Sequence, residues 1–230
     1  HPSPRPPVTS GNNPEPFVER FKRHDMKWVH VAPAVRFAQK AQQLGADGVV
    51  LVGFEAGGHP GMDDVALSVL VRKTSAELDI PIIAAGGISD GRSMMAALAW
   101  GAEGVQIGTR FMLTRESILH PDMKAALQRA SEHDTVMIER TLRKSRRVLR
   151  TAQSEAVLEL EREGAGFEQL RHIIGGEAYL ETILAGRSDR GVLSTGQCIG
   201  LLDDVPSVDD VVRRIIDESA LVLRRLNHMV

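Results

Sequence analysis

Two glycine-rich turns in the sequence have the residue types that bind a phosphate group. The apolar run Ile83-Ala84-Ala85 leads into Gly86-Gly87, and residues 104–107 lead into Gly108-Thr109. Backbone N–H groups that converge where such a turn enters a helix favour an anion, and the helix dipole adds to the effect. One Gly-Gly turn alone is more often only a tight turn. Two glycine-rich turns in successive strand–helix units favour a phosphate site.

A third glycine-rich segment, residues 53–61, carries groups that can move a proton. It places Glu55 and His59 among four glycines directly after an apolar run. Histidine exchanges a proton near neutral pH and can act as a general base. The alternative is a loop histidine that only bonds a backbone carbonyl, and from the residues alone the two roles stay open.

The elements that would position these turns read as alternating strands and helices. Short apolar runs at 28–32, 48–53, 81–85 and 104–108 predict strands, and residues 8–10 predict a further one. Segments 33–44, 65–78 and 92–100 have apolar residues at helical spacing. This alternation predicts βαβ units, and hence a parallel sheet with the three glycine turns at the carboxyl ends of its strands.

The pattern changes after Phe111. From Pro121 onward the chain is rich in helix formers, and we predict no strand there; residues 143–150 read as a solvated helix face and 208–226 as a closing amphipathic helix. Asp63 and Asp64 are expected to cap the helix that follows them. A closed barrel needs eight strands. The sequence therefore fits either an open α/β sheet with a helical tail or a barrel without its first three units.

Composition excludes several classes of function. Apolar residues make up 43% and charged residues 25% of the 230 residues, with a net charge of -2 and no basic stripe, so we expect no nucleic-acid partner. No apolar run is long enough for a membrane span. Cys198 is the single cysteine, which favours a reducing compartment such as the cytoplasm. No Cys/His cluster or ligand-spaced carboxylate set predicts a metal.

The three motifs, taken in order, resemble those of the nitronate monooxygenases, formerly called 2-nitropropane dioxygenases. The motifs are residues 55–61, 84–88 and 104–111, and the resemblance runs from about Gly11 to the C-terminus. Flavin enoyl-ACP reductases share the same motifs. The resemblance implies an FMN-dependent α/β protein of the (β/α)8 TIM-barrel type, apparently lacking the first three βα units. Residues 8–115 would be the C-terminal part of the barrel, and 116–230 a helical cap and closing helix of the same domain.

The resemblance also implies roles for particular residues. His59 would be the active-site base or the group that orients the substrate. The flavin would be lined by Ala56, Gly57 and Gly58. Its phosphate would be held by Gly86, Gly87, Gly108 and Thr109, and Gln106 would lie near the cofactor. The implied reaction is oxidation of an alkyl nitronate by O₂ to a carbonyl compound and nitrite, with a nitronate or nitroalkane as the small-molecule partner and a homodimer left open.

The sequence departs from the family pattern in two places. Many members carry Lys or Gln in the fifth barrel strand to contact the flavin, and the corresponding position here is Val31. The family's first three strands, with a Gly-Gly-Met loop that contacts the flavin, have no counterpart. Two alternatives therefore remain at this point: an NAD(P)H-dependent enoyl-ACP reductase, and an inactive partial barrel that binds phosphate or flavin without catalysis.

Overall fold

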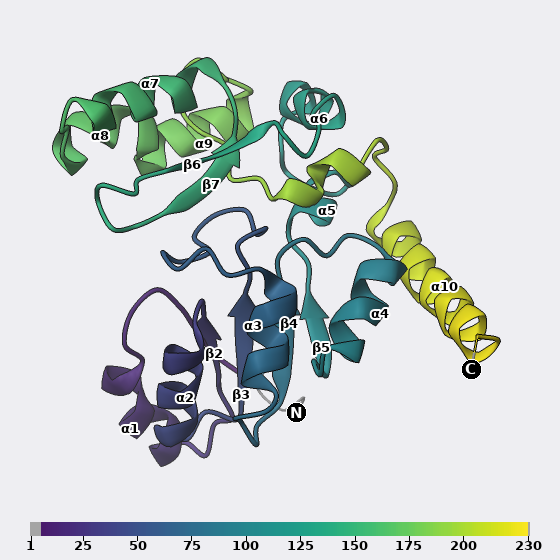
Figure 1. The fold of residues 1–230 in the computed structure, drawn as a ribbon. Helices are drawn as coiled ribbons and strands as arrows, with labels where there is room; N and C mark the ends of the chain where they lie inside the picture. The colour runs from purple at the N-terminus through teal and green to yellow at the C-terminus, as the bar shows by residue number, and fades with distance from the viewer. Residues whose placement is uncertain (1–5, 230) are drawn as a thin grey trace.

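A parallel sheet of five strands forms the centre of the computed structural model, which describes residues 6–229 (Figure 1). The strands follow one another in chain order: β1 (Val8–Thr9), β2 (Val29–Ala32), β3 (Gly48–Val52), β4 (Ile82–Ala85) and β5 (Gly104–Gln106). The predicted strands, their parallel pairing and their adjacency are confirmed. β1 and β5 do not pair with each other, so the sheet is open, as the strand count predicts.

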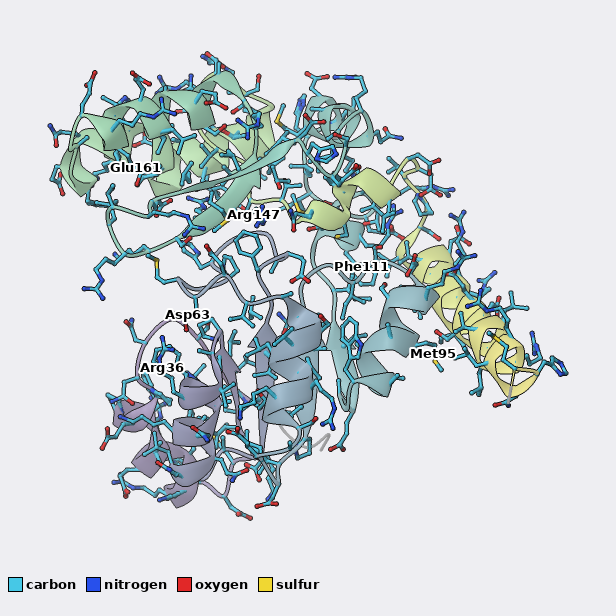
Figure 2. The ribbon with its side chains drawn as sticks, in the orientation of Figure 1. Arg36, Asp63, Met95, Phe111, Arg147 and Glu161 are labelled. Carbon is cyan, nitrogen blue, oxygen red and sulfur yellow. The ribbon has the colours of Figure 1, made fainter. Side chains whose placement is uncertain are left out.

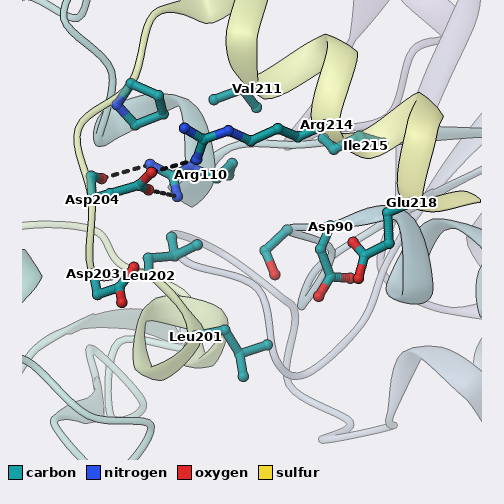
Figure 3. A pocket seen from close by; sticks show the side chains of 12 residues that line it. Asp90, Arg110, Leu201, Leu202, Asp203, Asp204, Val211, Arg214, Ile215 and Glu218 are labelled. Atoms are coloured by element: carbon teal, nitrogen blue, oxygen red, sulfur yellow. Dashed lines mark hydrogen bonds and ion pairs between the residues drawn. The ribbon is translucent and has the colours of Figure 1, made fainter.

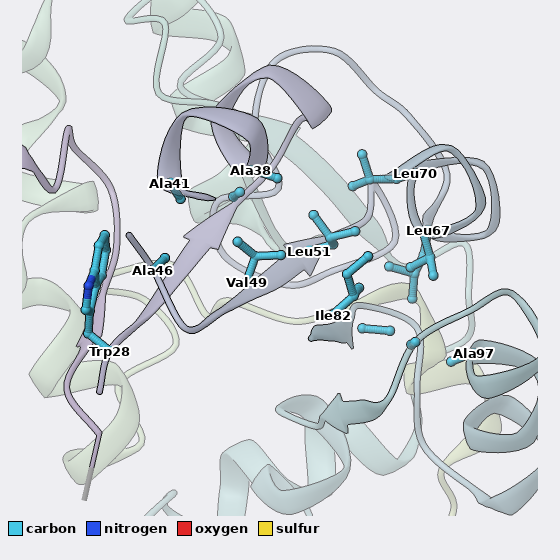
Figure 4. Packing of buried hydrophobic residues seen from close by; sticks show 14 of the residues in the cluster. Trp28, Ala38, Ala41, Ala46, Val49, Leu51, Leu67, Leu70, Ile82 and Ala97 are labelled. Carbon is cyan, nitrogen blue, oxygen red and sulfur yellow. The ribbon is translucent and has the colours of Figure 1, made fainter. Parts of the chain in front are cut away.

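Four helices connect these strands, and the last three lie close to the three predicted segments. They are α1 (Glu15–Arg23), α2 (Val35–Gln43), α3 (Leu67–Thr74) and α4 (Gly91–Ala99). The sheet residues that pack against the helices alternate along each strand, since side chains of a strand point to opposite faces. Val49 is in register with Ile82 on this face, and Leu51 with Ala84. Figure 4 shows them in one buried cluster, with Trp28 at its edge.

The prediction of no strand after Pro121 is wrong. β6 (Thr135–Ile138) and β7 (Arg146–Leu149) form an antiparallel pair, so 143–150 is not a solvated helix face. The two arginines of β7 are buried and hydrogen-bonded to the protein, with 8% and 3% of their surface exposed. Because two of its four residues are buried arginines, β7 lacks the apolar pattern by which the other strands were predicted.

The remaining helices surround this hairpin and close the chain. They are α5 (Thr109–Met112), α6 (Pro121–Gln128), α7 (Ala152–Arg162), α8 (Phe167–Ile174), α9 (Gly176–Ala185), the 3₁₀ helix η1 (Gln197–Leu201) and α10 (Val208–Asn227). The hairpin and α7–α9 lie above the carboxyl ends of the central strands, and α10 runs along α4 (Figure 1). The closing helix is therefore confirmed, and the second part of the chain is a cap over one edge of the sheet. Among residues 6–229, every helix is too short or too polar to span a bilayer.

Candidate functional site

The three glycine-rich loops meet at one edge of the sheet. Gly86 and Gly87 follow β4 directly, Gly108 follows β5 closely, and residues 53–61 follow β3. Because neighbouring parallel strands end at the same edge, the loops lie side by side, as the sequence predicts. Gly86 and Gly87 have φ angles of +109° and +73°. Residues with a Cβ atom rarely adopt this backbone conformation, so both positions favour glycine.

Close backbone approach fixes the loops against each other. A Cβ atom on Gly86 would lie 3.0 Å from the Ala56 Cβ, and one on Gly57 would lie 2.7 Å from the Gly196 nitrogen. The Gln197 N–H also donates to the Glu55 carbonyl at 2.9 Å. The segment around residues 194–197 is thus a fourth wall of the site, which no residue pattern distinguishes from an ordinary turn.

The chemistry of the loops fits a phosphate group. The N–H groups of Gly87, Gly108 and Thr109 donate to no residue that the structure describes. A side chain on Gly108 would meet no atom within 4 Å, so open space adjoins it. The Thr109 Oγ1 accepts from the Gly196 N–H at 3.0 Å, which holds the loop after β5 against the segment around Gly196. Unpaired donors around open space are what an anion requires.

The first turn of α4 does not supply these donors. The Asp90 carboxylate caps the helix by accepting from the Ser93 N–H at 2.8 Å, and the Gly91 N–H donates to the Glu218 carboxylate at 2.9 Å. The negative cap already satisfies the helix terminus. A phosphate at this edge would therefore depend on the glycine turns rather than on the end of the helix.

His59 lies beside the glycine loops and reaches a groove. The preceding residue, Gly58, pairs its backbone with Arg147 of β7 in both directions, at 3.0 and 2.6 Å. The side chain of His59 is exposed on one side, while burial of its other side lowers the pKa of its imidazole. The positive charges of Arg146 and Lys144 lower this pKa further. At neutral pH the ring is uncharged and free to accept a proton.

Arg147 holds this loop through its side chain, and sequence reasoning missed it. Its Nε and one terminal nitrogen donate to the Phe54 carbonyl at 3.1 and 2.9 Å, and the other terminal nitrogen donates to the Thr135 hydroxyl at 3.0 Å. Its guanidinium also lies 4.3 Å from the centre of the Phe54 ring. Figure 2 shows Arg147 between the hairpin and the loops below it. The sequence signals it only by an Arg-Arg pair directly before Val148-Leu149.

Glu55 is the cap of α3, so the prediction for Asp63 and Asp64 is wrong. Its carboxylate accepts from the Leu67 N–H at 3.2 and 3.0 Å. Asp63 pairs instead with Arg36, and Asp64 with Arg140. The two aspartates are too near the surface and too early in the loop to reach the helix start, whereas Glu55 reaches it from the glycine loop.

His30 is buried and lies away from the phosphate loops. Its Nδ1 is 2.8 Å from the Thr9 hydroxyl, and burial lowers its pKa. His30 also lines the groove that His59 reaches. Its neighbour Val31 lines the groove beside His59. Gln106 is exposed at the end of β5, at the same edge as Gly108.

Two cavities adjoin these elements. The larger, of about 640 Å³, runs from the loop after β1 to His59 and the β6–β7 turn. The smaller, of about 210 Å³, lies between η1, α4 and α10 (Figure 3). Arg110 in its wall is buried and bonds Asp204 at 2.9 Å, and Asp204 also pairs with Arg214. These pairs fasten α10 to α5, the short helix that carries Arg110. Within residues 6–229, no group of three or more His, Cys, Asp or Glu side chains is placed to hold a metal ion.

The chain is similar to a known protein family, to curated proteins and to solved structures. The nitronate monooxygenase family matches residues 6–218. The 5-hydroxy-7a-methyl-1-oxo-octahydro-1H-indene-4-carboxyl-CoA dehydrogenase of Rhodococcus jostii is 31% identical over 81% of this chain and 62% of its own length. The structure of FabK from Thermotoga maritima matches with a TM-score of 0.91 at 36% identity, over 97% of this chain and 71% of that one.

A nitroalkane oxidase from Streptomyces ansochromogenes also has this fold. It matches with a TM-score of 0.78 at 27% identity, over 96% of this chain and 66% of its own. The chain therefore spans between about three fifths and seven tenths of the length of these relatives. The match to structures of the (β/α) barrel type over nearly the whole chain confirms the predicted fold class.

Proposed function

The chain belongs to the nitronate monooxygenase family, and from this we propose that it takes part in FMN-dependent oxidation of alkyl nitronates by O₂ to a carbonyl compound and nitrite. The observation that carries the proposal is the meeting of three glycine loops and His59 at one edge of the sheet. Those loops offer unpaired N–H groups, and His59 offers an uncharged imidazole.

FMN would be held by the residues whose geometry fits it. Gly86, Gly87, Gly108 and Thr109 would bind its phosphate, and residues 56–58 would lie along the flavin, with Gln106 nearby. The isoalloxazine, when bound, supplies the electron transfer between substrate and O₂. Glycines in all of these loops allow the backbone to approach a planar ligand.

His59 would act on the proton that makes a nitroalkane reactive. A neutral imidazole nitrogen accepts the α-proton of the nitroalkane, and the resulting imidazolium then lies beside the negative oxygens of the nitronate. The pair of backbone bonds between Gly58 and Arg147 would keep the ring at this position. General-base catalysis of this kind contributes roughly 10²–10⁴-fold to a rate.

Oxygen consumption tests the proposed reaction. The protein, loaded with FMN, should consume O₂ and release nitrite when a preformed nitronate is added, without any nicotinamide. Absence of nitrite release from a protein that has bound FMN would exclude this function.

A second enzyme function has support from the likeness to FabK and to the Rhodococcus dehydrogenase. It is the NAD(P)H-dependent reduction of an enoyl thioester through the same flavin. Oxidation of NADH or NADPH in an anaerobic assay would favour it, because nitronate oxidation needs no nicotinamide. A purified chain that stays colourless after addition of FMN would instead support a non-catalytic partial barrel.

A further inference from the structure

The groove beside His59 has an unusual distribution of charge. Its volume is about 640 Å³, and its lining includes Lys40, Arg143, Lys144 and two histidines but no Asp or Glu. The whole protein, by contrast, has a net charge of -2. Two acidic groups on neighbouring segments are already paired, since Asp63 bonds Arg36 and Glu139 bonds Arg146. A concentration of positive charge in a concave surface attracts anions.

Two of these cations have no partner of their own. The side chains of Arg143 and Lys144 form no hydrogen bond or ion pair with any residue in the described part of the chain, and Lys144 lies only over the Phe167 ring at 5.8 Å. The third, Lys40, is 3.7 Å from the exposed carboxylate of Glu15. Beneath them, the Ser145 hydroxyl is buried and has no hydrogen-bond partner. A buried polar atom without a partner is uncommon in folded proteins.

The turn that presents Arg143 and Lys144 is fixed in place. Glu161 of α7, buried and 8% exposed, accepts from the Glu139 N–H at 2.9 Å and from the N–H and hydroxyl of Thr141 at 3.0 and 2.7 Å. Arg143 itself has a φ of +55°, which a residue other than glycine adopts only when its surroundings enforce it. The hydrogen bonds of Glu161 thus hold the turn that carries the two cations in one conformation.

The rest of the groove is mostly apolar, with Ser10, Asn12 and Asn13 as polar residues, and it is larger than a short alkyl nitronate needs. Val31, Pro33, Phe37, Val52 and Met62 line it. Cavities of about 300–1,000 Å³ hold organic molecules of drug size, whereas a short alkyl nitronate has only a few heavy atoms. A ligand that fills this groove must combine an apolar body with an anionic group at the β6–β7 turn.

We propose that the groove binds the phosphate-bearing part of an extended organic substrate, held at the turn by Arg143 and Lys144, whose reacting end reaches His59. Phosphate fits better than a carboxylate because it has more acceptor oxygens and more charge to match several cations. The phosphate of an acyl thioester carrier and that of a nicotinamide dinucleotide share this chemistry. Only the statement about the reacting end rests on the proposed function; phosphate binding does not.

Calorimetric titration tests the site with coenzyme A, NADPH and inorganic phosphate as probes, and with pantetheine as the matched probe without phosphate. The variants are Arg143→Gln/Lys144→Gln and a control, Arg224→Gln/Arg225→Gln, which removes the same charge from adjacent exposed residues of α10. We expect coenzyme A or NADPH to bind more tightly than inorganic phosphate, and pantetheine to bind at least tenfold more weakly than coenzyme A. The groove variant should lose at least tenfold in affinity, and the control should lose less than twofold.

The probe that binds more tightly, coenzyme A or NADPH, identifies the source of the phosphate. Equal affinity of the wild-type protein and the groove variant for both probes would overturn the proposal, and so would an equal loss in the control. Titrations of a Gly108→Leu variant separate this site from the proposed flavin site. Undiminished coenzyme A or NADPH binding there, with FMN binding lost, supports a separate groove site, and failure of FMN to bind the wild-type protein would affect only the proposed function.

Discussion

At the scale of single residues, His59 is the group whose chemistry can be tested most sharply. Replacing His59 with Asn in the FMN-loaded protein should slow turnover of a neutral nitroalkane by roughly 10²–10⁴-fold, because the general base is lost. Turnover of a preformed nitronate should fall much less, since no proton needs to be removed. Stopped-flow kinetics with both substrates measure the difference. Equal, small losses on the two substrates would mean that His59 is a structural loop residue.

The pH dependence of His59 follows from its surroundings. Its pKa is lowered by burial first and then by Arg146 and Lys144, so the neutral base persists below the usual histidine value of about 6.5. The rate with neutral nitroalkane should therefore fall only as the pH drops below that value. In Lys144→Gln one repelling charge is gone, and the acidic limb of the pH profile should move to higher pH. A limb that stays in place, or moves down, would rule out this electrostatic account.

Residue types alone predict part of the site. Glycines that follow apolar runs predicted that three loops meet at one edge of the sheet, and the place of His59 in one of them followed from the same pattern; their roles toward phosphate and substrate stay predictions. Arg147 and Glu55 could not be found in this way. Their roles depend on a hairpin and a helix start that come close only in the folded chain, and no local pattern describes such long-range contacts.

At the scale of elements, the β6–β7 hairpin positions the catalytic loop through Arg147. Replacing Arg147 with Met removes three hydrogen bonds and leaves the buried Phe54 carbonyl and Thr135 hydroxyl unpaired. We expect a loss of about 2–4 kcal/mol in the free energy of unfolding, since each unsatisfied buried group costs about 1–3 kcal/mol. Urea denaturation measures it.

The matched control for Arg147 lies on the same hairpin. Arg140 is half-exposed and bonds Asp64 at 2.8 Å, and exposed ion pairs contribute only about 0–1 kcal/mol. Arg140→Met should therefore change the free energy of unfolding by less than about 1 kcal/mol. If the two variants lose the same stability, the side-chain contacts of Arg147 do not hold the loop.

The elements themselves were predictable to different degrees. The strands and helices of the central sheet follow from continuous apolar runs that alternate with helical spacing, and each lies within a few residues of its predicted segment. The hairpin was not predictable, because Arg146 and Arg147 occupy buried strand positions and their charges are balanced by partners distant in sequence, such as Glu139 and Ser194. Charge at a buried position is satisfied by tertiary contacts that the local sequence does not contain.

At the scale of the whole molecule, the sheet is open, and the candidate site lies along one of its edges. The loops after β3, β4 and β5 come from consecutive strands and contact one another and the segment around Gly196. The proposed phosphate site is built from those loops and that segment. The account accordingly predicts that the isolated chain binds FMN through its phosphate.

Titration of FMN into the wild-type protein and two glycine variants, followed by quenching of flavin fluorescence, tests this central claim. A Cβ atom at Gly108 or at Gly176 of α9 would meet no protein atom within 4 Å, so we expect Gly108→Leu and the control Gly176→Leu both to fold. Gly108→Leu should weaken FMN binding at least about tenfold, the equivalent of losing one charge-assisted hydrogen bond of about 1.5–3 kcal/mol, and Gly176→Leu should bind as the wild type does. Unchanged FMN affinity in Gly108→Leu would contradict the placement of the phosphate between β4 and β5.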